Sequence, residues 1–316
     1  MRLFSRKKKN AELLAISLAV DGLFAANVRH ELAALPALDF VCFYPKAKQE
    51  WEVLLERLGR ETRAKKMSCS LLLNAGEYQL TSLESLNVPD DELKEAARFR
   101  LKEVLDYSVD EACYDLLKVP GDTNNAGRNS SLIAVVAKSA NIVKHQNAFI
   151  KAKLPLDVID VAEMAQRNIS ALLETPGRGL AMLSFDINGG ILTVSFAGEL
   201  YLSRRLDISS TDLRNPDVDE RGHVFERVSL ELQRSLDHFD RQHNYITTAK
   251  LVLSPIGAVA QDLKVFLSGN MYMPVEILDL ASIVNLTKIP EMEEPEKQAD
   301  FFYVIGAALR REVTAI

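Results

Sequence analysis

The chain has 316 residues, of which 47% are hydrophobic and 26% are charged. Because one hydrophobic core rarely grows past about 250 residues, this length predicts two core-forming units. The net charge of -6 and the pI near 5.5 argue against a general nucleic-acid binder. No apolar run reaches the ~18 residues that a membrane span needs.

Residues 1–10, MRLFSRKKKN, form a basic tail without an acidic residue or the apolar segment of a secretory signal. Its basic residues are Arg2, Arg6, Lys7, Lys8 and Lys9. One interpretation is a solvated tail. The other is a tail drawn to an anionic membrane surface, at roughly 1 kcal/mol per basic residue.

Residues 11–74 predict a compact series of three strands, a helix and a fourth strand. Residues 11–28 have the pattern strand, turn, strand, with Asp21-Gly22 in the turn, and a third strand covers 39–45. Apolar residues recur at helical spacing over 46–63, and a fourth strand follows over 67–74. The order resumes after residue 141, with predictions of a helix over 142–153, a strand over 155–161 and a helix over 162–174.

Residues 75–141 interrupt that order with an inserted strand-helix-strand-strand module. Its predicted elements are a strand at 78–83, a helix at 89–107 and strands at 112–119 and 131–138. Asp90, Asp91 and Glu92 suit the first turn of the predicted helix because carboxylates stabilise a helix amino terminus. The polar stretch GDTNNAGRNSS, between the last two strands, predicts a surface loop.

Residues 179–316 repeat the order of the first half. The predicted elements are three strands within 183–206, a helix at 220–243, a strand at 250–255, a helix at 259–267, a strand at 274–280 and a helix at 299–311. The acidic stretch 291–300 predicts an exposed linker before the last helix. The sequence thus predicts a basic tail at 1–10, a first half formed by 11–74 and 142–178, an insertion at 75–141 and a second half at 179–316.

Cys42, Cys69 and Cys113 lie in apolar-looking contexts, without CxxC or paired zinc-ligand spacing. We expect them to be buried, reduced thiols of a cytoplasmic protein. The five histidines show no metal-ligand spacing, and P-loop, Rossmann and GxSxG motifs are absent. No metal site and no catalytic residue is therefore predicted.

A duplicated α/β fold with this insertion resembles the actin and sugar-kinase superfamily (ribonuclease H-like, ASKHA) carrying an SHS2-like module. The insertion narrows the resemblance to the bacterial branch that contains FtsA and the pilus-assembly protein PilM. The segments LKEAARFRLKEVLDYSVDEACYDLLKV, SLIAVVAKSANIVKHQNAFIKAKLPLDVIDV, VSLELQRSLDHFDRQ and YVIGAALRRE look similar to PilM. Within that group, the basic start and the degenerate loops look most similar to MshI proteins of the mannose-sensitive haemagglutinin (MSHA) pilus system.

The resemblance implies a nucleotide cleft in which two facing hairpins grip phosphates through backbone N–H groups. The second hairpin keeps suitable residues, Asp186, Asn188, Gly189 and Gly190. The first hairpin has Ser17, Ala19 and Val20 where an aspartate and small residues are expected. The adenosine-side turn reads Ser254-Pro255-Ile256-Gly257-Ala258 in place of a glycine run, and Pro255 donates no N–H. A plain hairpin is the leading interpretation, and a weak or vestigial ATP site is the other.

The resemblance therefore implies a non-enzymatic scaffold of a type IV pilus machine, cytoplasmic and peripheral to the inner membrane. Its implied partners are the N-terminal tail of a PilN-like membrane protein and the assembly ATPase. The alternatives are an ATP-binding enzyme (a small-molecule kinase or ATPase) and a polymer-forming or cell-division adaptor like FtsA. A kinase should keep the acid of the first turn and the adenosine glycines, and this chain has neither.

Overall fold

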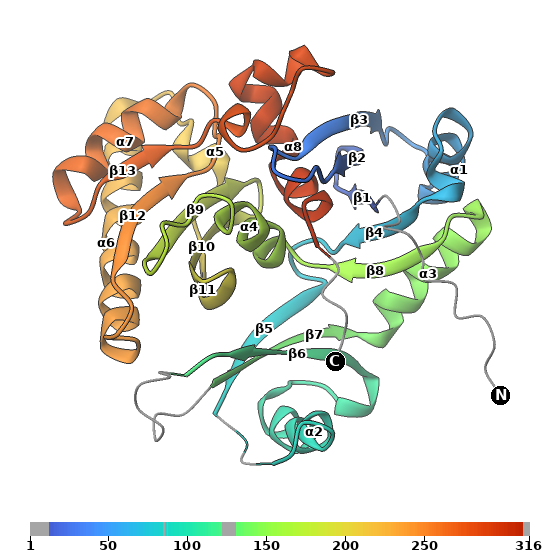
Figure 1. The fold of residues 1–316 in the computed structure, drawn as a ribbon, viewed down its shortest axis with the longest axis horizontal. Helices are drawn as coiled ribbons and strands as arrows, with labels where there is room; N and C mark the ends of the chain where they lie inside the picture. Colours follow the sequence, from blue (N-terminus) through green and yellow to red (C-terminus); the bar gives the residue numbers. More distant parts are fainter. Residues whose placement is uncertain (1–12, 85, 87, 122–130, 312–316) are drawn as a thin grey trace.

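The computed structural model describes residues 13–84, 86, 88–121 and 131–311. The basic tail at 1–10 and most of the polar loop after residue 121 lie outside the described residues. Figure 1 shows two mixed α/β halves side by side, with a third, smaller unit below them. The fold is the expected duplicated actin-like fold.

The two halves have sheets of the same topology. The first sheet has the strand order β3-β2-β1-β4-β8, and the second has β11-β10-β9-β12-β13. In both, the first strand pairs antiparallel with the second and parallel with the fourth. The strands of the first sheet are β1 (Leu13–Leu18), β2 (Gly22–Arg29), β3 (Ala37–Pro45), β4 (Ser68–Leu72) and β8 (Leu156–Asp160). Those of the second are β9 (Gly179–Asp186), β10 (Gly189–Phe196), β11 (Glu199–Leu206), β12 (Thr248–Leu253) and β13 (Val275–Ile277).

Helices cover both sheets close to the expected places, apart from the short α5, which was not predicted. They are α1 (Trp51–Glu61), α3 (Ser139–Ala152), α4 (Ala162–Ser170), α5 (Ser210–Leu213), α6 (Val218–Gln242), α7 (Val259–Asn270) and α8 (Pro295–Ala308). Short 3₁₀ turns are η1 (Ala64–Lys66), η2 (Val109–Glu111), η3 (Leu280–Ser282) and η4 (Pro290–Glu293). Asp217 caps the start of α6, because its carboxylate accepts from the backbone N–H groups of Asp219 and Glu220.

Helices α4 and α8 lie at the centre of the molecule, and each packs on the sheet of the other half. Helix α4, from the first half, contacts β9, β10 and β11, whereas α8, from the second half, contacts β1, β2 and β4. The two helices pack so closely that a Cβ on Gly306 would lie 2.4 Å from the backbone oxygen of Ala165. The Asn168 amide donates to the backbone oxygen of Gly306 at 2.9 Å. Burial of this shared core joins the halves into one packed body.

The insertion forms a three-stranded antiparallel sheet of order β5-β7-β6, covered on one face by a helix. Its elements are β5 (Tyr78–Leu83), α2 (Leu93–Val104), β6 (Ala112–Val119) and β7 (Ser131–Lys138). Leu93, Ala97 and Leu101 of α2 are buried against Leu83, Leu132, Ala134 and Val136. The strand-helix-strand-strand order is as predicted.

Three local expectations were wrong. The stretch 291–300 is mostly exposed, as expected, but it is not a linker before the last helix, because it contains the end of η4 and the first residues of α8, which starts at Pro295. Asp90, Asp91 and Glu92 precede α2, which begins at Leu93, instead of lying in its first turn. Cys69 is buried, but Cys42 is only partly buried and Cys113 is exposed on the edge strand β6.

Candidate functional site

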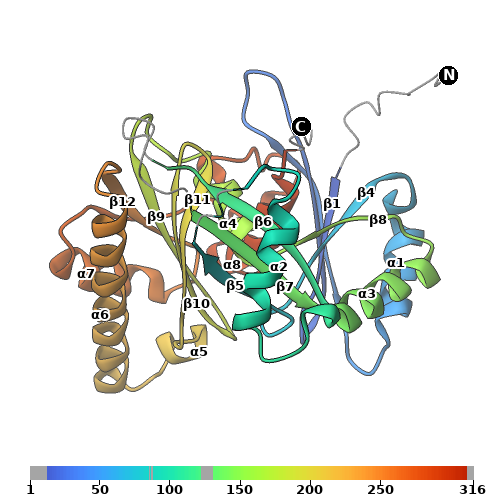
Figure 2. The same cartoon turned by 90° about the horizontal axis from the view of Figure 1, so that it is seen from below.

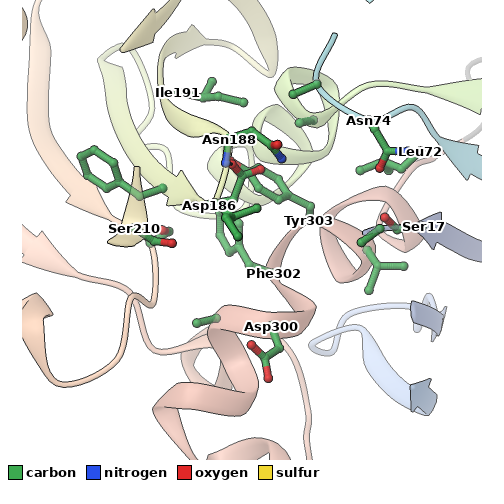
Figure 3. Close-up of a pocket in the computed structure, with 18 of the residues that line it drawn as sticks. Ser17, Leu72, Asn74, Asp186, Asn188, Ile191, Ser210, Asp300, Phe302 and Tyr303 are labelled. Atoms are coloured by element: carbon green, nitrogen blue, oxygen red, sulfur yellow. The ribbon is translucent and has the colours of Figure 1, made fainter. Parts of the chain in front are cut away.

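A cavity of about 350 Å³ lies between the two halves, where the hairpins β1–β2 and β9–β10 and helix α8 meet. Figure 3 shows Ser17 and Asn74 on one side of this cleft, Asp186, Asn188 and Ser210 on the other, and Asp300, Phe302 and Tyr303 on helix α8. The structure therefore brings the three predicted turns to one place, since Ser17, Asp186 and Pro255 all line the cavity.

The first hairpin is a tight two-residue turn. The Ala19 N–H donates to the Gly22 oxygen at 2.9 Å, and the Gly22 N–H donates back to the Ala19 oxygen at 3.2 Å. Val20 at its tip is 83% exposed, and Asp21 lines the cavity. Gly22 is required by packing, because a Cβ there would lie 2.4 Å from the Tyr44 backbone oxygen.

The second hairpin is held by its own side chains. The Asp186 carboxylate accepts from the Asn188 N–H at 2.6 Å, so that amide is already paired within the turn. Gly189 has φ +137°, and a Cβ there would lie 2.7 Å from the Leu206 oxygen. A Cβ on Gly190 would lie 2.8 Å from the Phe185 ring. Hairpin packing alone thus accounts for both glycines.

The adenosine-side turn is filled by its own residues. Ser254, Pro255 and Ile256 are buried, with Ile256 only 2% exposed. The Ile256 backbone oxygen accepts from Arg214 at 3.3 Å. At Gly257, with φ +71°, a Cβ would meet the Glu296 carboxylate at 3.3 Å, so helix α8 approaches this turn closely.

The charged groups of the cavity are mainly acidic. Asp21, Asp186 and Asp300 line it, together with Arg205 and Arg214. Burial raises the pKa of Asp300, and the nearby Asp21 carboxylate adds to that rise. Both guanidinium groups already donate hydrogen bonds within the protein. A polyphosphate that entered the cavity would therefore be repelled by three carboxylates. The two guanidinium groups there already have hydrogen-bond partners within the protein.

Sequence reasoning missed a buried cluster at the floor of the cleft that joins all three units. Glu163 of α4 is fully buried and accepts from the Tyr78 hydroxyl of β5 at 2.6 Å and from Arg205 of β11 at 2.9 Å. The Tyr78 oxygen also accepts from Arg205 at 2.6 Å and from the Ala162 N–H at the start of α4. Burial raises the pKa of Tyr78 well above its usual value, and the Glu163 charge adds to the rise.

A second buried network continues from the same helix. Gln166 donates to the Met182 oxygen at 2.7 Å and to the Thr193 hydroxyl at 2.9 Å. Its own oxygen accepts from Ser184, whose hydroxyl lies 2.7 Å from that of Tyr303. Burial raises the pKa of Tyr303, so the ring stays neutral at physiological pH. These bonds fix α4 and α8 against the second sheet.

The insertion presents two further features. Strands β5 and β6 are the edges of its sheet, and a hollow of about 360 Å³ lies on its outer side. Arg98, Phe99, Lys102 and Tyr107 line this hollow, and Phe99 is 70% exposed. An extended peptide could pair with a strand edge, and an apolar side chain could enter the hollow.

Two other kinds of interaction, with a metal ion and with the interior of a bilayer, concern the described residues. No three His, Cys, Asp or Glu side chains there gather closely enough to hold a metal ion. Within the same ranges, no helix combines the length and the apolar character that crossing a bilayer requires.

Known proteins of similar structure identify the fold. No protein-family model and no curated protein matches the sequence. The structure is similar to a chain of the PilM-PilN type IV pilus biogenesis complex, with a TM-score of 0.75 and 18% identity over 95% of this chain and 98% of that one. A Bacteroides thetaiotaomicron protein with an actin-like ATPase fold gives 0.48 at 10% identity, covering 92% and 99% of the two chains. The cytoplasmic domain of EpsL, from the Vibrio cholerae type II secretion system, gives 0.45 at 14% identity, covering 77% and 82%. At 18% identity the first of these similarities shows the fold, which matches that chain of the PilM-PilN complex over 95% of the present chain.

Proposed function

We propose that this protein is a non-enzymatic scaffold of a type IV pilus assembly machine. The observation that carries the proposal is the similarity to a chain of the PilM-PilN complex, which spans the insertion as well as both halves. The partner would be the cytoplasmic N-terminal tail of a PilN-like membrane protein. The protein would then act on the cytoplasmic face of the inner membrane, with the assembly ATPase as a second contact.

The cleft supports a scaffold over the alternative of an ATP-binding enzyme. In the second hairpin the Asn188 N–H is already bonded to Asp186, and the buried Ile256 fills the adenosine-side turn. Three carboxylates line the cavity. These residues do not fit a nucleoside triphosphate. We therefore propose a vestigial site at Asp186, Asn188, Gly189 and Gly190, with no phosphoryl transfer. A finer assignment, to the MSHA pilus and its MshI proteins, rests on the sequence resemblance alone.

We place the partner peptide between the insertion and the first half. Strand β5 begins there, two residues after Gly76, and its hydroxyl-bearing Tyr78 anchors it to α4. Main-chain pairing along a strand edge would supply affinity, and pockets between side chains would supply selectivity. Because such tails are disordered when free, the cost of ordering them would limit the affinity. The competing role for the insertion is packing or self-association.

The test is a titration of the full chain with a synthetic N-terminal peptide of the PilN-like partner, followed by backbone-amide NMR. Shifts should concentrate in 68–84, 112–121 and 131–138, and a scrambled peptide of equal charge should cause none. Shifts around Phe99 and Tyr107 alone would move the site to the outer hollow. Shifts confined to the second half, or none at millimolar peptide, would refute the proposal.

A further inference from the structure

At one end of the strands of the first sheet, segments that are distant in the sequence come together; we call this end of the sheet the strand-end edge. Leu13 at the start of β1 pairs with Ser68 at the start of β4, and Leu14 pairs with Asn27 near the end of β2. Cys69 donates to the Pro155 oxygen just before β8. The starts of β1, β4 and β8 and the end of β2 therefore share this edge, which faces the upper right in Figure 2.

A ridge of basic side chains lies along this edge. We call the exposed set Arg60, Arg63, Lys65, Lys66 and Lys153 the basic ridge. Arg60 is in the last turn of α1, Arg63 directly precedes η1, Lys65 and Lys66 lie within η1, and Lys153 directly follows α3. The two segments touch, because a Cβ on Gly59 would lie 3.1 Å from both the Lys65 side chain and the Leu154 side chain.

No ion pair neutralises the charge of the ridge in the part of the chain that the structure describes. Residues 57–66 contain five basic residues and one acidic residue, Glu61. Glu61 pairs with Arg57 at 2.8 Å, and Lys151 beside the ridge pairs with Glu52. Among the described residues, no carboxylate forms an ion pair with any member of the basic ridge. By contrast, the basic residues Lys94, Arg98 and Arg100 of α2 each have an acidic partner.

Exposed apolar side chains occur at the same edge. The loop between β2 and β3 begins where β2 ends, and its Leu32 is 100% exposed and its Leu35 48% exposed. Adjacent strands lie about 4.8 Å apart, so the end of β2, where this loop begins, is two strand widths from the start of β4, which Lys66 closely precedes. Basic residues beside exposed leucines are the pattern of a surface that binds at the lipid headgroup boundary.

We propose that this edge docks onto an anionic membrane surface. The basic ridge would contact lipid phosphates, and Leu32 and Leu35 would enter the interfacial layer. Charge complementarity favours this partner, since each Lys or Arg near an anionic leaflet contributes ~1 kcal/mol, or about five-fold in affinity.

This orientation leaves the rest of the molecule accessible. The insertion leaves the first sheet after the opposite end of β4, and the hairpin of β1 and β2 that lines the cleft is also at that opposite end. A membrane-docked protein would thus present the insertion and the cleft away from the lipid. The proposal is independent of which peptide the insertion binds.

The test is co-sedimentation of the full chain with vesicles of phosphatidylglycerol and phosphatidylcholine in equal parts, against pure phosphatidylcholine. The quadruple variant R60Q/R63Q/K65Q/K66Q should lose at least about ten-fold in affinity for the anionic vesicles, since four headgroup contacts are removed. The matched control K94Q/R98Q/R100Q/K102Q removes the same charge from α2 and should bind normally. Leu32→Asp should weaken binding that persists at high salt, because salt screens only the charged contacts.

Equal binding to neutral and anionic vesicles, or equal losses in the two quadruple variants, would overturn the proposal. Circular dichroism would confirm that each variant is folded. Retention of duplex DNA by the wild type, abolished in the ridge variant while vesicle binding is unchanged, would identify the edge as a nucleic-acid surface instead.

Discussion

The Glu163 carboxylate of α4 lies 2.9 Å from the Arg205 guanidinium of β11, and this pair joins the two halves at the floor of the cleft. Glu163 is fully buried, whereas the Arg205 side chain is 40% exposed. Tyr78 brings the insertion into the same cluster. The relative placement of the three units is therefore held by protein contacts at the floor of the cleft.

Replacing Arg205 with methionine should destabilise the protein. The variant leaves the buried Glu163 charge with only the Tyr78 hydroxyl, and breaking a buried pair from one side costs about 3 kcal/mol, less where the pair is partly exposed. Urea unfolding would measure the loss of unfolding free energy. Arg204→Met is the matched control on the same strand, because Arg204 is exposed and forms no ion pair with the described residues, and it should change stability by less than about 0.5 kcal/mol. Equal effects of the two substitutions would contradict the role of the cluster.

Much of this architecture could be predicted from the sequence, because it depends on periodic apolar residues. The two halves and the insertion follow from strand and helix patterns such as those over 183–206 and 220–243. The cluster of Tyr78, Glu163 and Arg205 could not be predicted in this way, since its members are 85 and 42 residues apart and meet only through the topology. In the stretch 291–300, the acidic composition led to the prediction of a linker where α8 begins. The proline at the first position of α8 was a signal that could have indicated this start.

The second hairpin should respond to substitution as a packed turn. In Gly190→Ala the new methyl group would collide with Phe185, and overpacking of this kind costs about 1–3 kcal/mol. Asp186→Ala removes one hydrogen bond to the Asn188 N–H and should cost about 1 kcal/mol. Thermal or urea unfolding would give both values. A Gly190→Ala variant as stable as the wild type would show that the glycine is kept for another reason.

Mg-ATP should bind weakly or not at all, and hydrolysis should not exceed background. The physical reasons are the filled turn at Ile256 and the excess of carboxylates in the cleft. Isothermal titration calorimetry with Mg-ATP would measure the affinity directly, and Asp186→Ala serves as the comparison variant. A micromolar dissociation constant that this substitution abolishes would instead establish a working nucleotide site.

Acid should destabilise the protein through Glu77, which links α3 to the first hairpin. Its carboxylate lies 2.8 Å from His145 Nε2 and accepts from the Asn74 N–H at 2.9 Å, and the Asn74 amide donates to the Leu18 oxygen where β1 ends. Burial alone would raise the pKa of Glu77, but the bonds from His145 and Asn74 outweigh it, so the folded-state pKa lies below the usual 4.5. The unfolded chain therefore takes up a proton at higher pH than the folded one does.

The contribution of Glu77 should be complete above about pH 4.5 and should be lost as the pH falls through its lower folded-state value. Urea unfolding at a series of pH values from neutral to below 4 would reveal it as a steeper fall for the wild type than for Glu77→Gln, which has no charge to lose. Glu56→Gln, an exposed position on α1, controls for the general loss of one carboxylate and should keep the wild-type slope. If Glu77→Gln retains the wild-type acid dependence, another group must carry the acid response, and the link from α3 to the first hairpin would not depend on the Glu77 charge.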